Sequence, residues 1–271
     1  MQFALAFALA LGLTVMSGAA QRFRILTNGR NLQIPINHGL PEKRLGFTFC
    51  RLRYEKTRQA RKSGWGDDYP QADYNFMVRL AELTRTTISL WNNGYPGFAN
   101  VTAMDPDLFR CPYLRMQNAA NYDFTPEEAD RMRAYLMKGG FLWVDDFWGT
   151  RAWDQWADAM RQVLPEHPIF DIPLDHPIRE TLFDVSHVPQ VPGINFWRAS
   201  GGGTAERGND SPQADFRGIA DSHGRIMVVM THNTDIGDSM ERESEDPAFF
   251  AAFSPEGYQV TIDMVLYALT H

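Results

Sequence analysis

Two adjacent aspartates, Asp145 and Asp146, follow the apolar run Phe141 to Val144 in the stretch GGFLWVDDFWGT. The apolar run predicts a buried strand, and carboxylates at a strand end can act as a base, contact a ligand or hold a hard cation. Neighbouring strand residues point to opposite faces, so both aspartates can enter one site only if the strand has already ended. The alternative is structural, with one aspartate capping the next helix or turn and the other facing solvent.

A second aspartate pair, Asp67 and Asp68, stands between Trp65 and Tyr69 in the stretch WGDDYP. The chain before the proline is expected to be extended. One interpretation is a turn and cap ahead of a helix that begins near Ala72. The other is a loop that folds over a cleft, where aromatic rings beside carboxylates suit a sugar or another polar ring.

A third cluster of polar residues lies in THNTDIGDSME, which contains His232, Asn233, Asp235, Asp238 and Glu241. All five can form hydrogen bonds or bind a metal. Their spacing matches neither an EF-hand loop nor a zinc motif, so the sequence assigns no metal ligands. His232 at a strand end is a candidate for the cleft, and the alternative is a hydrogen-bonded structural histidine.

The elements that must position these residues can be read from hydrophobic periodicity and capping signals. Helical signals cover residues 72–85, 125–140, 150–164 and 255–269, with Thr125, Pro126 and Glu128 forming a capping box and Thr150 as the cap of the third helix. Strand signals cover residues 46–54, 86–91, 111–116 and 141–146, and a pair of strands is expected on either side of residues 221–224. The stretch 167–215 is broken by proline and glycine and receives no element.

The alternation of strands with helices, and central strands that are apolar on both faces, predict an α/β fold of three layers around a mostly parallel sheet. In open sheets of this kind, ligands bind beyond the carboxyl ends of the strands. The candidate cleft therefore combines strand-end residues with the loop before the first helix: Arg115, Asn118, Asp145, Asp146, His232, Asn233, Asp235, Trp65, Asp67, Asp68 and Tyr69.

The first twenty residues (1–20) are typical of a secretory signal peptide, with an apolar run and small residues at Gly18 and Ala20 before the expected cleavage. The apolar run is about 13 residues, shorter than the roughly 20 needed to span a bilayer. We therefore expect export to the periplasm or the extracellular space without a stable membrane span. A short uncleaved anchor is the alternative. Residues 21–44 are expected to form an extended lead-in, and residues 45–271 a single domain.

Charge and cysteine content limit the partners. The net charge is −7, yet residues 22–62 are basic, so the remainder of the chain is strongly acidic. The basic segment either covers the acidic body or binds an anionic partner. An acidic exported chain without a recognised motif is not expected to bind nucleic acid. Cys50 and Cys111 could pair after export, although free cysteines also pack well in apolar strands.

Several segments together resemble one bacterial family, the domain of unknown function 4159, over about residues 45–271. They are WGDDYPQADYNF, LAELT, LFRCPYLRM, YLMKGGFLWVDD, DHPI, THNTDIGDSME and VLYALTH. The resemblance implies a fold similar to the class I glutamine amidotransferases, a flavodoxin-like, doubly wound sheet. It implies no catalytic residue and no cofactor.

Amidotransferase chemistry itself is not expected. It needs a cysteine on a glycine-flanked elbow, followed by a backbone N–H that helps to form the oxyanion hole. Cys111 has no flanking glycine, and Pro112 after it has no N–H. Cys50 is expected in the middle of a strand.

Three functions remain open. The favoured one is non-catalytic binding of a polar ligand or an envelope protein at the carboxyl edge of the sheet. The second is a hydrolase that uses Asp145 or Asp146 with His232, alone or with a divalent cation, and it requires these three side chains to converge. The third is a scaffold whose basic N-terminal segment, Arg22 to Arg30, docks an acidic partner.

Overall fold

The computed structural model describes residues 39–41, 46–55 and 64–271. These residues form an α/β fold with a seven-stranded, mostly parallel sheet in the order β2-β1-β3-β4-β7-β6-β5. The expected signal peptide and the basic segment Arg22 to Arg30 lie outside the described residues. Within the described ranges, no helix has the length and apolar character needed to cross a membrane.

Five strands run parallel and end at one edge of the sheet, and the two remaining strands form an antiparallel extension. The parallel strands are β1 (Phe49–Leu52), β2 (Phe98–Val101), β3 (Tyr113–Gln117), β4 (Phe141–Asp145) and β7 (Ile226–His232). The extension consists of β6 (Asp215–Ala220) and β5 (Ile169–Asp171). Because β6 runs against β7, its first residue, Asp215, pairs with His232 at the same edge.

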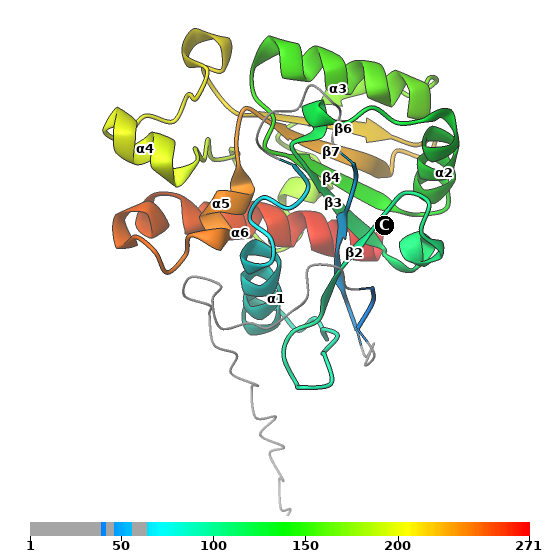
Figure 1. Ribbon diagram of the computed structural model, residues 1–271, viewed down its shortest axis with the longest axis horizontal. Helices are drawn as coiled ribbons and strands as arrows, with labels where there is room; N and C mark the ends of the chain where they lie inside the picture. Colours follow the sequence, from blue (N-terminus) through cyan, green and yellow to red (C-terminus); the bar gives the residue numbers. More distant parts are fainter. Residues whose placement is uncertain (1–38, 42–45, 56–63) are drawn as a thin grey trace, which may run out of the picture.

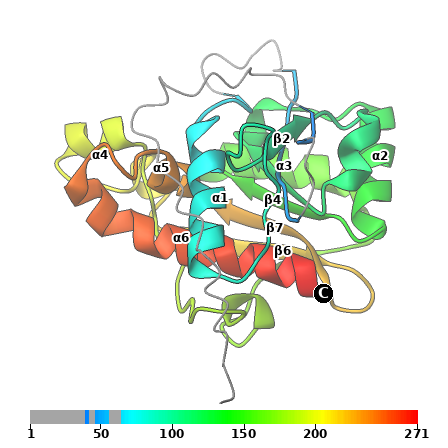
Figure 2. The same cartoon turned by 90° about the horizontal axis from the view of Figure 1, so that it is seen from below.

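Helices cover both faces of the sheet (Figure 1). One face carries α1 (Gln71–Leu83), α5 (Ile236–Glu241) and α6 (Pro247–Thr270), and the other carries α2 (Pro126–Met137) and α3 (Gly149–Val163). The short α4 (Ile194–Ser200) lies beside α5 and the first turns of α6 (Figure 2). Two separate apolar cores result, one on each side of the sheet. This explains why the central strands place apolar side chains on both of their faces.

The side chains of strand β1 alternate between the two cores. Phe49 joins the core beneath α1, whereas Cys50 and Leu52 join the core beneath α2 and α3. Cys50 forms a disulfide with Cys111, which lies just before β3. Both cysteines are buried, so the bridge ties two neighbouring strands together inside the core.

One predicted strand is wrong. Residues 86–91 form only isolated bridges through Ile88 and Leu90, and the edge strand is β2, ten residues further along the chain. The chain turns back in between, with the N–H of Trp91 donating to the carbonyl of Tyr95 and Gly94 at φ 83°. The apolar composition of 86–91 reflects packing at the amino end of β1 rather than pairing along it.

The predicted starts of two helices are also wrong. The first helix is capped by residues far away in the sequence, and the second begins at an earlier residue than predicted. α3 begins at Gly149, whose N–H donates to Asn233 Oδ1, and Thr150 is inside the helix with its N–H bound by Asp210. α6 begins at Pro247 after Asp246, whose carboxylate accepts the N–H groups of the first turn. The predicted start at residue 255 lies within that helix. The predicted capping box of α2 and the β6–β7 pair are confirmed.

Candidate functional site

The carboxyl end of β4 delivers both of its aspartates to one polar cluster. Asp145 is the last residue of β4, and Asp146 follows in the left-handed region at φ 55°, so the strand has ended between them. Arg115 Nη2 donates to Asp145 at 3.0 Å and to Asp68 at 3.2 Å. Gln117 Nε2 donates to Asp68 at 2.6 Å and to Asp146 at 3.3 Å. The two aspartates therefore share donors with a third carboxylate from another loop.

Asp145 also caps a helix, which is the structural role that the sequence offers as the alternative for one of the two aspartates. It accepts hydrogen bonds from Thr231 Oγ1 and from the N–H groups of Ile236 and Gly237, which begin α5. Burial raises the pKa of Asp145, and the neighbouring Arg115 guanidinium opposes that rise. Asp145 thus caps a helix and lies in the cluster at the same time.

The loop of residues 64–70 lies across the end of β3. Asn118 Nδ2 donates to Asp67 at 3.0 Å and to Asp146 at 2.7 Å, and so joins this loop to the end of β4. The aromatic side chains of the loop face elsewhere. The ring centres of Trp65 and Tyr69 lie 5.5 Å apart with the rings tilted by 57°, and the Tyr69 hydroxyl accepts a hydrogen bond from Asn100 of β2. The loop therefore contributes carboxylates rather than rings to the cluster.

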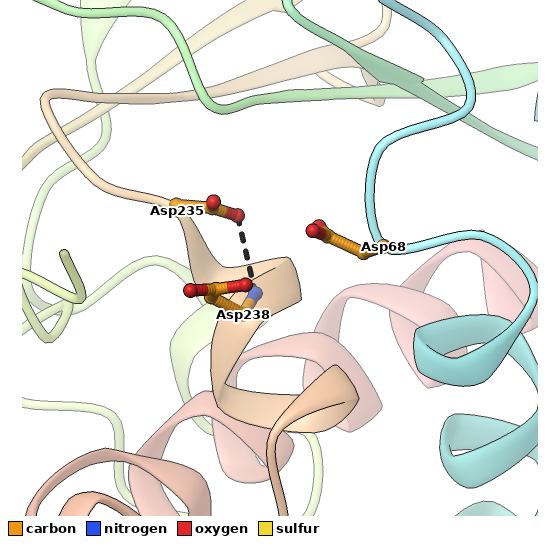
Figure 3. Close-up of side chains that lie close together, drawn as sticks. All are labelled: Asp68, Asp235 and Asp238. Carbon is orange, nitrogen blue, oxygen red and sulfur yellow. Dashed lines mark hydrogen bonds between the residues drawn. The ribbon is translucent and has the colours of Figure 1, made fainter. Parts of the chain in front are cut away.

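Three carboxylates lie close enough together to hold a single ion. Oxygens of Asp68, Asp235 and Asp238 all lie within 4.8 Å of one another. Figure 3 shows Asp68 reaching from its loop toward Asp235 and Asp238, which stand at the start of α5. All three are buried, with exposed fractions of 8%, 7% and 4%. We call these residues the aspartate trio.

The charge around the trio is unbalanced. Burial, with the nearby carboxylates of Asp146 and Asp68, raises the pKa of Asp235 well above its usual value. Burial and Asp68 raise the pKa of Asp238 to about 7, and the same causes raise the pKa of Glu241 to about 9. Carboxylates outnumber the guanidinium groups here, so protonation of some carboxylates, or a nearby positive charge, would lower the repulsion between them.

A buried ion pair orients the donors of the cluster. Arg51 and Asp73 are both buried and paired at 3.0 Å. Arg51 Nη1 also donates to Gln117 Oε1 at 2.8 Å, which turns the amide so that its Nε2 faces Asp68. The sequence did not predict Gln117 or Asp73 for the site. Arg51 was the available signal, because an arginine between apolar positions on a buried strand requires a buried carboxylate partner.

Strained backbone conformations concentrate at this edge. Among the described residues, four that are not glycine have positive φ: Asp68 (59°), Asn118 (53°), Asp146 (55°) and Asn233 (61°). Three of them follow the ends of β3, β4 and β7, and the fourth is in the loop above. Such conformations persist only where the surrounding contacts enforce them, and they gather at functional sites.

His232 does not join the aspartates. Its Nδ1 lies 2.9 Å from Asp215, its Nε2 lies 3.1 Å from the carbonyl oxygen of Gly149, and its ring packs on Phe147 and Trp153. Because Thr231 points toward Asp145, the next strand residue points to the opposite face. The convergence that the predicted hydrolase requires is therefore absent. Asn233 serves mainly as the cap of α3.

The remaining candidates come together. Asp67, Asp68, Arg115, Asn118, Asp145, Asp146 and Asp235 form one hydrogen-bonded and electrostatic cluster. The sequence identifies Asp238 and Glu241 as residues that can bind a metal or form hydrogen bonds, but it does not place them in the cleft. In the structure both lie in the cluster. Sequence spacing misses the trio because its members lie on two segments that are far apart in the chain.

Comparison with known proteins identifies the family of this chain. The family described as "Domain of unknown function (DUF4159)" matches residues 48–269, which include the whole cluster. A search among curated proteins found no match. The chain therefore belongs to the DUF4159 family, as the sequence motifs indicate.

Proposed function

We propose that this domain is an exported binding protein whose carboxyl-edge cluster holds a positively charged ligand, in the first place a divalent cation such as Ca²⁺ or Mg²⁺. The aspartate trio is the observation that carries the proposal. Both cations prefer carboxylate oxygens, at about 2.0–2.6 Å. Two oxygen ligands of one Ca²⁺ ion can be no more than about 5 Å apart, and the trio oxygens, all within 4.8 Å of one another, meet this limit; Mg²⁺, whose limit is about 4.2 Å, would need them to draw closer.

The surrounding groups support binding rather than covalent catalysis. His232 is engaged by Asp215 and the Gly149 carbonyl, and both cysteines are in the disulfide, so neither thiol is available as a nucleophile. The disulfide also supports export to an oxidising compartment. The order β2-β1-β3-β4-β7 of the parallel strands supports a flavodoxin-like, doubly wound classification.

The first experiment measures the melting temperature of the mature protein against Ca²⁺ and Mg²⁺, beside Asp235→Asn. We expect either cation to raise the melting temperature of the wild type. Asp235→Asn should melt higher than the wild type without cation, because it removes a repelled carboxylate, and should lose the cation response. Asp154→Asn, at an exposed position of α3, is the matched control and should behave as the wild type. An unchanged response in Asp235→Asn would refute the site.

The cation response should depend on pH. The pKa of Asp238 is raised to about 7, so its protonated form stabilises the fold below the ordinary value of 3.8, and this contribution is lost as the pH rises toward 7. The cation-free protein should therefore lose stability between pH 4 and pH 7 through this group. Cation binding needs the ionised form, so the shift caused by Ca²⁺ should grow from pH 5 to pH 8. A shift of equal size at both pH values would contradict binding by these carboxylates.

A metal-dependent hydrolase is the second candidate, because a divalent cation held by the aspartate trio would be able to activate a bound water molecule. It predicts cation-dependent release of p-nitrophenol from p-nitrophenyl phosphate or p-nitrophenyl acetate that disappears in Asp238→Asn. Cation binding without turnover of either ester favours the binding protein.

A further inference from the structure

A second polar site surrounds a buried arginine that is not part of the acidic cluster. Arg179 is only 6% exposed and ends a short turn of 3-10 helix, Pro177–Arg179. It borders a pocket of about 430 Å³. The other lining residues come from two segments, 186–190 and 212–216.

No acidic residue in the part of the chain that the structure describes pairs with Arg179. Its Nη1 and Nη2 atoms donate to the carbonyl oxygens of Val185 and Ile172, each at 3.1 Å, and its guanidinium lies 4.6 Å from the centre of the Phe216 ring. Its Nε is buried and has no hydrogen-bond partner within residues 39–41, 46–55 and 64–271. Burial lowers the pKa of Arg179, and no acidic group among the described residues opposes that effect. A buried cation of this kind is normally paired, so an anion in the adjoining pocket would complete it.

The pocket walls indicate what kind of anion fits. Val188, Pro212, Ala214 and Phe216 provide apolar surface, and the exposed side chains of Ser186 and Gln213 can donate hydrogen bonds from the rim. His187 at the rim already lies 3.1 Å from Glu256. Arg179 therefore supplies the only cation without an acidic partner among the described lining residues. One positive charge beside apolar walls suits a monovalent carboxylate better than a dianionic phosphate.

We propose that the Arg179 pocket binds the carboxylate of a small organic acid with an apolar body. No residue of the aspartate trio lines the pocket, and the acidic trio would repel such a ligand. The domain thus carries two sites of opposite charge preference.

The test uses the full mature protein and sodium benzoate as the probe, at constant ionic strength, with isothermal titration calorimetry as the readout. We expect benzoate to bind, while benzamide, which has the same shape without the charge, and inorganic phosphate bind more weakly. Arg179→Gln should abolish benzoate binding if circular dichroism shows that it folds. Asp154→Asn, at an exposed position of α3, should leave benzoate binding unchanged.

Arg179→Gln can unfold the protein, because Arg179 also donates to two backbone carbonyl oxygens. A second variant, Ser186→Asp, therefore tests the proposal without changing Arg179. This exposed change places a negative charge at the rim and should weaken benzoate binding at least tenfold, whereas Ser186→Asn, of the same size, should not. Equal binding of benzoate by the two Ser186 variants, equal binding of benzamide, or tighter binding of phosphate would overturn the proposal. So would the absence of binding at about 10 mM benzoate, which nearly fills a site of millimolar affinity.

Discussion

Asp145 links the site to the fold through a single carboxylate. It accepts hydrogen bonds from Arg115, Thr231 and the first two N–H groups of α5. The Asp145 side chain therefore contributes charge to the cluster and also holds the start of α5. That helix follows Asp235 directly and contains Asp238. Any change that separates α5 from β4 should disturb the trio as well.

Gly237 tests this dependence. A β-carbon there would collide with Arg115 Nη2 and Asp68 Oδ2. Alanine normally stabilises a helix relative to glycine, but here overpacking should dominate, and we expect Gly237→Ala to lower the free energy of unfolding by about 2 kcal/mol or more. Urea denaturation measures the change. Gly66→Ala, in the loop above the site, is the control, because nothing lies within 4 Å of its β-carbon. Equal stability of the two variants would show that α5 can move away from Arg115.

Helices α2 and α3 begin in different ways. The start of α2 is set locally, since Thr125 Oγ1 accepts the N–H of Glu128 at 3.2 Å and the Glu128 carboxylate accepts the N–H of Thr125 at 3.0 Å. The start of α3 is set from a distance, by Asn233 and Asp210. A local cap can be read from the sequence, whereas a cap supplied by a distant loop cannot.

The local cap of α2 should contribute modestly to the free energy of unfolding, and substitutions of Thr125 measure that contribution. Thr125→Ala removes the side-chain acceptor and should lower the free energy of unfolding by about 1 kcal/mol. Thr125→Ser keeps the hydroxyl and should retain most of the stability. The urea midpoints of the two variants give the comparison, provided that the slope of each transition is unchanged. A serine variant as unstable as the alanine variant would mean that the methyl group, rather than the cap, matters.

At the scale of the whole molecule, the sheet and the disulfide decide where the polar groups meet. The five parallel strands bring Arg115, Gln117, Asp145 and Asp146 to one edge, and the chain returns to that edge after β7 with Asp235. The disulfide joins β1 to the segment before β3 across 61 residues of sequence. That span contains the loop that carries Asp68, so the bridge limits how far this loop can travel in the unfolded chain.

Removing the bridge should therefore destabilise the whole domain. In the chain-entropy description, a closed loop of this length contributes about 4 kcal/mol. We expect Cys50→Ala/Cys111→Ala to lose roughly 2–5 kcal/mol in guanidinium unfolding, and a thiol assay of the unfolded wild type to find no free cysteine before reduction. Unfolding that is insensitive to the double substitution, or two free thiols in exported protein, would contradict the bridge.

The sequence by itself determined the features that depend on neighbouring residues. Hydrophobic patterning predicts β1, β3 and β4, as well as the β6–β7 pair, and the capping box predicts the start of α2. The rule that ligands bind beyond parallel strand ends places Asp145, Asp146 and Asn118 at one edge. Family motifs indicate the family that the comparison then shows.

Only the tertiary structure decided which of these side chains meet. Alternation along β7 sends Thr231 to Asp145 and His232 to Asp215, a choice that depends on strand register rather than on residue type. The trio joins Asp68 to Asp235 and Asp238 across more than half of the chain, and Arg51 finds Asp73 across 22 positions. Contacts between such distant positions leave no local pattern, because packing of whole elements, and not the chemistry of adjacent residues, brings them together.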